Sequence, residues 1–340
     1  MQNNIVLILL NKKELIIMFE ISNLIGNTPI IRIKYEYNSN IKYAYAKLEY
    51  YNLTGSIKDR VAYYIIINAK KRGILKEKMP IIEATSGNTG IALAALGKYY
   101  NHPVYIFMPD WVSKERIKLM ESYGANVVLI SKEKGGFIKC VEESKTLAKR
   151  INGFCANQFE NNDNLLAHYE TTGEEILNQI SEKIGGFISG VGTGGTLTGV
   201  GKRLKKQYKN MKIIAIEPDK MPIISKKDVR GNHKIEGIGD EFVPDLLDKD
   251  IIDEIILVND EDSINMSRLL AEKLGLGVGI SSGANFLGSV LAGEGLANPI
   301  VTVFPDDNKK YISTELFEKI RNDRNFISNK IRLIGYEAIK

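Results

Sequence analysis

Short apolar runs alternate with longer amphipathic segments along most of this 340-residue chain. In the first half, strands are expected at residues 81–83, 104–108 and 127–130, and helices at 91–100, 114–123 and 137–151. In the second half, strands are expected at 187–191, 213–216, 255–258 and 300–304, and helices at 197–208 and 262–274. This alternation is typical of a largely parallel sheet that carries helices on both faces.

The pattern predicts two open, twisted α/β domains with a ligand cleft between them. The Asn- and Gly-rich segment at 151–164 lacks helical periodicity, so we place the boundary there. We expect a smaller domain over residues 52–160, and a larger domain formed by residues 18–51 together with 161–325. Ligands in open α/β folds usually bind at the carboxyl ends of the strands.

Composition excludes several classes of function. An apolar content of 44% is sufficient for a large core. Two cysteines, three histidines and the absence of a CxxC motif indicate neither a disulfide framework nor a Cys/His metal site, and they fit a reducing cytoplasm. The basic stretches at 202–206 and 226–234 lack interleaved aromatic residues, so we expect solvated surfaces and no nucleic-acid partner.

The amino terminus carries an apolar run at residues 5–10. It is too short to span a bilayer, and it lacks the flanking features of a signal peptide, so no membrane partner is expected. Residues 1–17 are expected to form a peripheral extension. Met18 is a candidate start of translation, because the organised pattern begins at Phe19.

Three polar clusters follow expected strands. The first reads Asn-Leu-Thr-Gly-Ser-Ile-Lys-Asp-Arg over residues 52–60, the second Thr-Ser-Gly-Asn-Thr-Gly over 85–90, and the third Gly-Thr-Gly-Gly-Thr over 192–196. Glycines at the start of a helix let an anion approach the unpaired backbone N–H groups closely. One candidate amine, Lys58, beside two anion-binding loops suits pyridoxal phosphate chemistry.

Lys58 becomes a candidate only because of the two neighbouring loops, since most lysines near a helix start are solvated. A lysine that forms a Schiff base must be partly deprotonated, which burial or a nearby cation achieves by lowering its pKa. Asp59 and Arg60 are candidates for adjusting that pKa. For the second loop, a helix start capped by Asn88 or Thr89 is the alternative without a ligand.

The third cluster also fits a dinucleotide-binding fingerprint. Glycines recur as G-x-G-x-x-G over residues 190–195, and Glu217 ends the next expected strand. On this motif alone, an NAD-dependent oxidoreductase stays open. Thr193 and Thr196, however, place hydroxyls around the loop, which suits a terminal phosphate better than a pyrophosphate.

Together these motifs resemble the cysteine synthase and cystathionine β-synthase family, which are pyridoxal-phosphate enzymes of fold type II, the tryptophan synthase β-like fold. The resemblance runs from about Met18 to Thr314. Its motifs are Ile25-Gly26-Asn27-Thr28-Pro29, the Lys58 cluster, residues 83–90, Asn157-Gln158-Phe159, Thr171-Thr172-Gly173, residues 190–196, residues 236–239 and residues 279–283.

The resemblance implies a role for each matching residue. Lys58 would hold pyridoxal 5'-phosphate as an internal aldimine, Asn88 would donate a hydrogen bond to the ring hydroxyl oxygen, and Ser281 would face the pyridine nitrogen. The residues implied to cradle the phosphate are Gly192, Thr193, Gly194, Gly195 and Thr196. The residues implied to receive the substrate carboxylate are Thr85, Ser86, Thr89 and Gln158.

The implied reaction is a β-elimination on a small L-amino acid that gives an aminoacrylate, followed by addition of a nucleophile. Sulfide is the nucleophile or the leaving group, and Lys58 acts as a general base. A serine at position 281 cannot hold the ring nitrogen strongly protonated, which favours loss of the β-substituent. The resemblance also implies a homodimer.

Asp240 departs from the family pattern, in which cysteine synthases usually carry a small residue and cystathionine β-synthases an aromatic one. Residues 236–244 and Pro305-Asp306 favour the cystathionine branch. A carboxylate at position 240 could deprotonate water or a thiol, so we hypothesise that L-cysteine and water give L-serine and hydrogen sulfide, or that a second thiol is added. A solvated loop aspartate is the alternative.

Other functions stay open at this point. They are a cystathionine or lanthionine β-synthase that uses a thiol nucleophile, and a non-catalytic homologue that binds a partner protein. The sequence does not distinguish O-acetylserine, serine and cysteine as the donor, because the preference for a leaving group depends on pocket shape.

Overall fold

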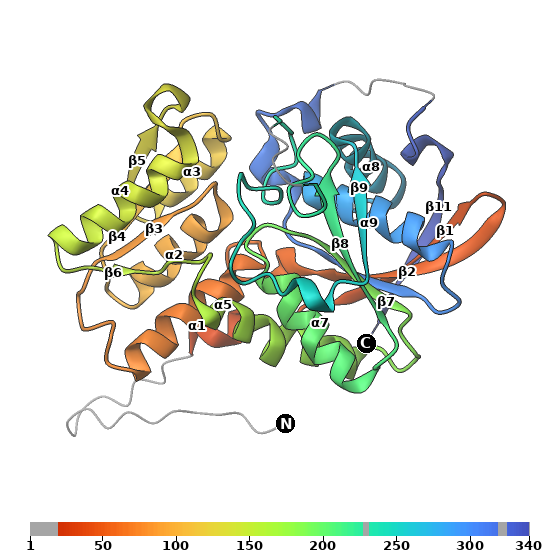
Figure 1. Cartoon of the computed structure of the whole chain (residues 1–340), viewed down its shortest axis with the longest axis horizontal. Helices are drawn as coiled ribbons and strands as arrows, with labels where there is room; N and C mark the ends of the chain where they lie inside the picture. Colours follow the sequence, from red (N-terminus) through yellow and green to blue (C-terminus); the bar gives the residue numbers. More distant parts are fainter. Residues whose placement is uncertain (1–19, 227–230, 319–324, 340) are drawn as a thin grey trace.

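The computed structural model describes residues 20–226, 231–318 and 325–339. The extension expected at 1–17 and the candidate start at Met18 lie outside these residues, as does part of the basic stretch at 226–234. The chain forms a seven-stranded sheet in the order β11-β1-β2-β10-β7-β8-β9 and a four-stranded sheet in the order β5-β4-β3-β6 (Figure 1). This confirms the predicted α/β class with two sheets.

The four-stranded sheet is parallel throughout. Its strands are β3 (Ile81–Ala84), β4 (Val104–Pro109), β5 (Asn126–Ile130) and β6 (Phe154–Cys155), and its helices are α1 (Lys58–Lys71), α2 (Asn88–Tyr99), α3 (Lys114–Ser122) and α4 (Gly136–Arg150). Successive strand residues point to opposite faces. Ile81 packs in the core under α1 and α2, whereas Ile82 packs in the core with Phe137 of α4.

The seven-stranded sheet is mixed. Its strands are β1 (Ile30–Tyr37), β2 (Asn40–Leu48), β7 (Gly186–Gly190), β8 (Lys212–Pro218), β9 (Glu254–Val258), β10 (Ile300–Phe304) and β11 (Arg332–Ile339). Its helices are α5 (Asn162–Ala167), α6 (Gly173–Gln179), α7 (Gly195–Gln207), α8 (Asp260–Leu274) and α9 (Ile280–Gly293). Strands β2, β10, β7, β8 and β9 run parallel, and β1 is antiparallel to both β2 and β11.

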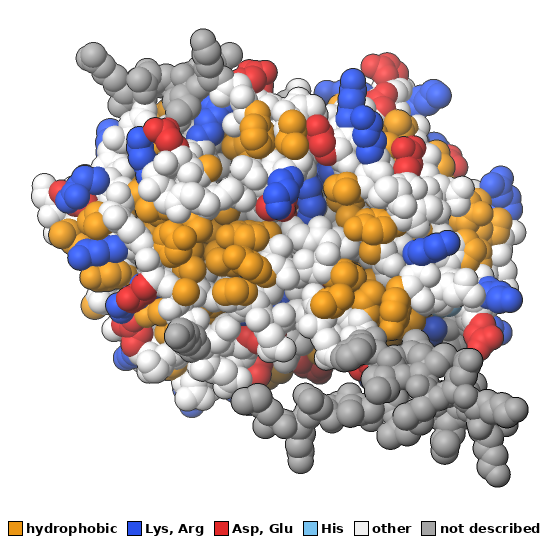
Figure 2. Space-filling model, turned by 180° about the vertical axis from the view of Figure 1, so that it is seen from behind, with side chains coloured by type: hydrophobic (Ala, Val, Ile, Leu, Met, Phe, Trp, Pro, Cys, Tyr) orange, Lys and Arg blue, Asp and Glu red, His pale blue; other side chains and the backbone are white. Residues whose placement is uncertain are grey.

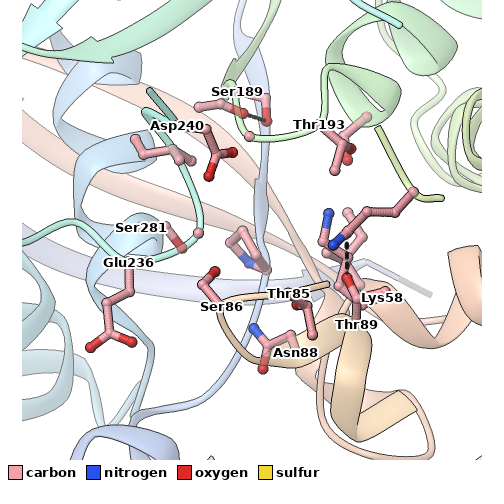
Figure 3. Close-up of a pocket in the computed structure, with 18 of the residues that line it drawn as sticks. Lys58, Thr85, Ser86, Asn88, Thr89, Ser189, Thr193, Glu236, Asp240 and Ser281 are labelled. Carbon is pink, nitrogen blue, oxygen red and sulfur yellow. Dashed lines mark hydrogen bonds between the residues drawn. The ribbon is translucent and has the colours of Figure 1, made fainter. Parts of the chain in front are cut away.

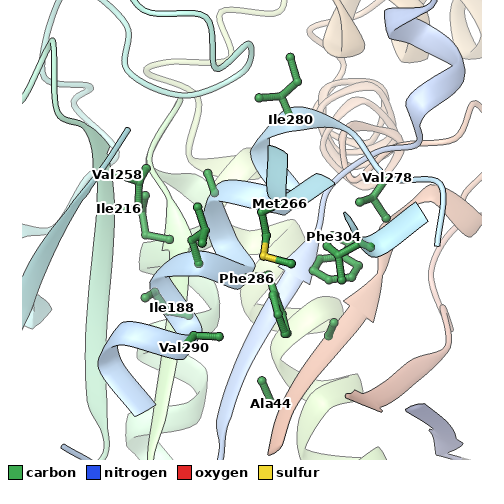
Figure 4. Packing of buried hydrophobic residues seen from close by; sticks show 14 of the residues in the cluster. Ala44, Ile188, Ile216, Val258, Met266, Val278, Ile280, Phe286, Val290 and Phe304 are labelled. Carbon is green, nitrogen blue, oxygen red and sulfur yellow. The ribbon is translucent and has the colours of Figure 1, made fainter. Parts of the chain in front are cut away.

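Helix α9 lies at the centre of the larger core. Its residue Phe286 is fully buried and packs edge-on against Phe304 of β10, with 6.5 Å between the ring centroids (Figure 4). Ile188 and Ile216 of the neighbouring strands belong to the same cluster. The alternate residues Phe187 and Ile213 pack in a second cluster with Leu197 of α7. Both faces of the parallel strands are therefore covered, which explains why these strands are almost continuously apolar.

Every strand and helix that the hydrophobic pattern predicts is present, with bounds that differ by three residues at most. The largest difference is at the start of α2, because this helix begins inside the polar cluster at Asn88. Strands β1, β2, β6 and β11 and helices α5, α6 and α9 were not predicted. The domain limits proposed from the sequence stay a prediction, although all strands of the smaller sheet come from residues 81–155.

Candidate active site

A pocket with an empty volume of about 760 Å³ lies between the two sheets, where β3, β7 and β10 end (Figure 3). The predicted site residues that line it are Lys58, Thr85, Ser86, Asn88, Thr89, Gln158, Gly192, Thr193, Thr196, Asp240 and Ser281. Gly194 and Gly195 are not among the lining residues. The fold thus brings together side chains that lie more than 200 positions apart in the chain.

Lys58 is the first residue of α1, and its position is fixed by the loop before the helix. The carboxylate of Asp59 accepts hydrogen bonds from the backbone N–H of Thr54 (2.8 Å) and from the Thr54 hydroxyl (2.6 Å). The backbone N–H of Ile57 donates to the carbonyl of Pro305 at the end of β10 (2.8 Å). These bonds place the start of α1 against the larger sheet, at the floor of the pocket.

Burial lowers the pKa of Lys58 to about 8, although the negative charge of Asp240 opposes this effect. The amine is therefore easier to deprotonate at neutral pH than that of an ordinary lysine. Arg60, which was a candidate for this adjustment, makes bidentate contacts with Glu49 and Glu175 at distances of 2.5–2.9 Å. Its charge is balanced locally, so burial is the cause of the lowered pKa.

The turn before α2 supplies hydroxyl and amide groups to the pocket. Gly87 occupies the N-cap position, and no side chain caps the helix. The proposed cap by Asn88 or Thr89 is therefore wrong. The first backbone N–H groups of α2 lie at the end of the helix that borders the pocket. The Thr89 hydroxyl donates to Oε1 of Gln158 (2.6 Å), whose Nε2 donates to the carbonyl of Ala84 (3.1 Å).

The amide of Asn88 is held from the opposite side of the pocket. Its Nδ2 donates to Oδ2 of Asp306 (2.8 Å), and its buried Oδ1 has no hydrogen-bond partner among the described residues. An amide carries two N–H donors, so one donor and the oxygen remain available to a ligand. Ser281, at the start of α9, is 4% exposed and lies across the pocket (Figure 3).

The turn before α7 has the geometry of an anion site. Gly194 has a left-handed backbone (φ +80°) and forms the N-cap without a side-chain cap. A Cβ atom at Gly195 would lie 2.1 Å from Oδ1 of Asn164, and one at Gly192 would lie 2.4 Å from the carbonyl oxygen of Gly237. The hydroxyl of Thr193, which accepts from Asn164 Nδ2 (2.9 Å), stands beside the helix start. Uncapped N–H groups, close backbone and hydroxyls suit a phosphate.

The glycines of the dinucleotide fingerprint have another explanation. A Cβ atom at Gly190 would lie 2.6 Å from Ile238, so both Gly190 and Gly192 are small because the segment at 237–239 packs on them. Glu217, the expected ribose ligand, accepts hydrogen bonds from the backbone N–H groups of residues 224 and 225. The fingerprint therefore reflects packing between loops.

Asp240 lies on the same loop, facing the pocket. Burial raises the pKa of its carboxyl to about 6, while the charge of Lys58 opposes the shift and that of Glu241 adds to it. A carboxylate of this kind is a stronger base than an exposed aspartate and is still mostly ionised at pH 7. Asp240 is only partly exposed and lines the pocket, which favours the proposed base over a solvated loop aspartate.

Sequence reasoning missed Arg116 and its ion pair with Glu236. Arg116 is 2% exposed, lines the pocket, forms an ion pair with Glu236 and lies 4.6 Å from the ring centroid of Tyr311. Glu236 stands within a motif that we noted, but Arg116 lies on an ordinary amphipathic helix. No local pattern marks it as a pocket residue.

The site fits pyridoxal phosphate on the residues themselves. It offers an amine whose pKa is lowered by burial, a glycine-rich helix start without a side-chain cap, and an amide oxygen on Asn88 that has no hydrogen-bond partner among the described residues. Among the described residues, no group of three or more His, Cys, Asp or Glu side chains could hold a metal ion, and no helix is long and apolar enough to cross a membrane.

Comparisons with known proteins agree with this site. Residues 21–306 match the family model of pyridoxal-phosphate dependent enzymes. The chain is 41% identical over 302 residues to a cysteine synthase of Staphylococcus aureus, which covers 87% of this chain and 96% of that protein. It is also 41% identical over 299 residues to cysteine synthase B of Campylobacter jejuni, covering 88% and 98%.

Solved structures extend the likeness to the fold. A hydrogen sulfide-producing enzyme from Fusobacterium nucleatum is 46% identical, with a TM-score of 0.89 and coverage of 92% of this chain and 95% of that one. An O-acetylserine dependent cystathionine β-synthase from Helicobacter pylori is 33% identical, with a TM-score of 0.82 and coverage of 89% and 99%. The oxidoreductase alternative is therefore dropped. The chain belongs to the pyridoxal-phosphate dependent enzymes, within the cysteine synthase and cystathionine β-synthase family, and its cofactor is pyridoxal 5'-phosphate.

Proposed function

We propose that this enzyme converts L-cysteine and water to L-serine and hydrogen sulfide, with Lys58 and Asp240 as its two catalytic residues. The observation that carries the proposal is the placement of a carboxylate and an amine, both only partly exposed, in the same pocket, with the pKa of Asp240 raised to about 6 and that of Lys58 lowered to about 8. Two groups tuned in this way can each move a proton near neutral pH.

The residues proposed to hold the cofactor lie beside both sheets. Lys58 would hold the cofactor, the turn at 192–196 would receive its phosphate, and Asn88 and Ser281 would contact the polar atoms of its ring. When bound, pyridoxal phosphate supplies an electron sink that makes the substrate α-proton and β-substituent easier to remove. The residues of this chain then orient the substrate and move the protons.

The amino-acid carboxylate is received at the start of α2. Uncapped backbone N–H groups and the hydroxyls of Thr85, Ser86 and Thr89 present donors there, and Gln158 fixes Thr89 through the 2.6 Å hydrogen bond. These hydrogen bonds orient the α-carbon of the substrate toward Lys58. The amine of Lys58 would accept the proton from that carbon.

Asp240 acts on the second half of the reaction. Its carboxylate removes a proton from the incoming water, so that the hydroxyl adds at the β-carbon from which sulfide has left. General-base catalysis of this kind contributes roughly 10²- to 10⁴-fold to a rate. The Fusobacterium relatives give independent support, since they are described as hydrogen sulfide-producing, and one was solved as an aspartate-to-asparagine variant with an α-aminoacrylate intermediate.

The test compares two reactions of one variant. Asp240→Asn keeps the side-chain shape but cannot accept a proton, so serine formation from cysteine should fall by about 10²-fold or more. Synthesis of cysteine from O-acetylserine and sulfide should change little, because the hydrosulfide ion needs no general base. Asp245→Asn, an exposed carboxylate farther along the same segment, is the matched control. Unchanged release of sulfide and serine by Asp240→Asn would rule out this role.

A thiol nucleophile is the second candidate. Glu236 and Asp306 belong to the motifs that favour the cystathionine branch, and both lie beside Arg116 at the pocket. One structural relative is an O-acetylserine dependent cystathionine β-synthase. Mass spectrometry of products from cysteine alone, and from O-acetylserine or serine with homocysteine, distinguishes the two. A thioether as the main product from cysteine alone would favour the thiol route over water.

We also propose a homodimer in the cytoplasm. Figure 2 shows hydrophobic side chains gathered in patches on the face opposite to that of Figure 1. Large exposed hydrophobic residues of the described chain include Leu24, Tyr51, Ile312 and Phe317, each more than half exposed. Such patches mark interaction surfaces. Light scattering of the purified protein tests the dimer. The two free cysteines fit a reducing compartment, and cell fractionation tests that location.

A further inference from the structure

The loop at residues 236–242, which we call the strap, crosses from the larger sheet toward the smaller one over the pocket. Its middle is fastened to the larger sheet. The backbone N–H of Gly239 donates to the carbonyl of Val191 (2.9 Å), and the ring of His233 makes a 2.7 Å hydrogen bond with the carbonyl of Gly239. Ile238 is buried against Gly190.

The first end of the strap is held by charge. Glu236 forms an ion pair with Arg116, which belongs to α3 beside the four-stranded sheet. The guanidinium of Arg116 also lies 3.8 Å from the carboxylate of Asp306 and stacks 4.6 Å from the ring centroid of Tyr311. Because the Arg116 side chain is almost fully buried, this pair is only weakly screened by salt.

The second end is held by aromatic packing. The ring of Phe242 meets that of Phe159 edge-on, with 5.1 Å between the centroids and 66° between the planes. Phe159 packs in the same manner against Phe137 of α4, at 5.7 Å. A row of three aromatic rings therefore connects the strap to the helix that covers the smaller sheet, and such edge-to-face pairs have a preferred geometry.

Asp240 lies between these two attachments. Gly237 (φ +92°) and Gly239 (φ +71°) both have left-handed backbones, so the segment before Asp240 is built from residues of high conformational freedom. The hydrogen bonds of Gly239 fix the middle of the strap on the larger sheet, and the attachments at Glu236 and Phe242 fix its two ends toward the smaller sheet. These contacts together determine where the carboxylate of Asp240 lies.

We propose that Arg116, Glu236 and Phe242 are positioning residues for Asp240, which hold the strap across the pocket at a charged end and an aromatic end. The proposal rests on the proposed function, in which Asp240 is the base that activates water. Loss of either attachment would let the strap lift and admit water around the carboxylate. Asp240 would then be misplaced and less basic, because burial is the main reason for its raised pKa.

Phe242 provides the cleanest test, since it is not among the residues that line the pocket. In Phe242→Ala, serine formation from cysteine should fall roughly 10- to 100-fold in kcat, with KM nearly unchanged. The acidic limb of the rate profile, expected near pH 6 in the wild type, should move to lower pH. Phe242→Tyr keeps the ring contact and should restore both values. Asp245→Asn, an exposed residue just beyond the strap, should behave as the wild type.

The charged end is tested separately with Glu236→Gln and Arg116→Lys. Both should lower kcat for serine formation, and the double variant should lose less than the sum of the single effects, because the two side chains form one interaction. A Phe242→Ala enzyme that keeps the wild-type kcat and acidic limb would overturn the proposal. A lower melting temperature without any change in the pH profile would also overturn it.

These outcomes can be separated from failure of the proposed function. If the wild type releases no serine from cysteine, or if Asp240→Asn retains that activity, the assigned reaction is wrong before the strap is considered. If both results agree with the proposed function and the strap variants show no effect, only the positioning role fails.

Discussion

Two turns, one before α2 and one before α7, begin their helices on a glycine without a side-chain cap. Their surroundings differ. At the α7 turn, a Cβ atom at Gly192 would meet the backbone oxygen of Gly237 at 2.4 Å, and one at Gly194 would meet the backbone nitrogen of Leu247 at 2.8 Å. At the α2 turn, a Cβ atom at Gly90 would meet only side chains, the nearest being Met120 and Thr85 at 2.8 Å.

This difference matches the different tasks of the two turns. Backbone cannot rotate away, so the α7 turn is rigid and suits a cofactor phosphate that stays in place over many turnovers. The flexible Met120 side chain next to Gly90 can change rotamer, so we expect the α2 turn to adjust more easily as one amino acid is exchanged for another.

The largest expected effect comes from Lys58, which stands between the two turns. Lys58→Ala should lower all turnover by at least on the order of 10³-fold, since the variant lacks the amine that we propose holds the cofactor and moves the α-proton. Some pyridoxal phosphate should remain bound without a covalent link, because the α7 turn is intact. Absorbance after gel filtration measures this. Borohydride reduction and peptide mapping of the wild type should label Lys58, and an unlabelled Lys58 would contradict the assignment.

The second largest effect distinguishes the α7 turn from the α2 turn. Gly192→Ala forces a methyl group into the backbone of Gly237, so cofactor affinity should fall roughly 10- to 100-fold, in line with the cost of overpacking. Gly90→Ala meets side chains that can move, so it should raise KM for the amino acid less than about 10-fold while leaving cofactor affinity almost unchanged. Fluorescence titration with pyridoxal phosphate and steady-state kinetics measure the two. Equal loss of cofactor in both variants would refute the contrast.

A smaller effect should follow from removing one hydroxyl at the α2 turn. Thr89→Ala leaves Oε1 of Gln158 without its 2.6 Å donor, which should raise KM for the amino acid by roughly 5- to 10-fold. Thr89→Ser, which keeps the hydroxyl, should recover most of the affinity. The result to look for in kinetics is a change in KM with little change in kcat. A loss of cofactor affinity instead would contradict the proposal that Thr89 receives the substrate carboxylate.

The smallest effect concerns stability of the cofactor-free protein. The raised pKa of Asp240 means that the folded state binds more protons than the unfolded state between about pH 4 and pH 6. This group therefore makes the protein less stable as pH rises through that window. Asp240→Asn should remove the decline and add on the order of 2 kcal/mol at pH 7. Urea unfolding at pH 4 and pH 7 tests this, and an equal change at both pH values would contradict it.

Much of this architecture was readable from local sequence. Parallel strands buried on both faces appear as apolar runs, so β3, β4, β7, β8 and β10 were predicted nearly to the residue. Most of the predicted site residues proved to line one pocket, because turns at the carboxyl ends of parallel strands open on the same edge of a sheet. Their individual roles stay predictions.

The parts that were missed depend on distant partners or on an overlooked turn. Strand β11 pairs with β1 about 300 residues earlier, which no local pattern reveals. The hairpin of β1 and β2 did have a signal, since Asn38 and Ser39 form a two-residue turn with left-handed backbones (φ +49° and +61°). The contact between Arg116 and Glu236 joins two elements 120 residues apart and had no signal.

The strand order of the larger sheet has a consequence for how this protein is made. Strand β10 inserts between β2 and β7, so the edge of β2, available early in synthesis, waits for a partner that leaves the ribosome some 250 residues later. Strands β3 to β6, in contrast, come from one continuous stretch and can pair as soon as they emerge. We therefore expect nascent chains to carry a folded smaller half and an exposed β-edge, the kind of surface that chaperones recognise.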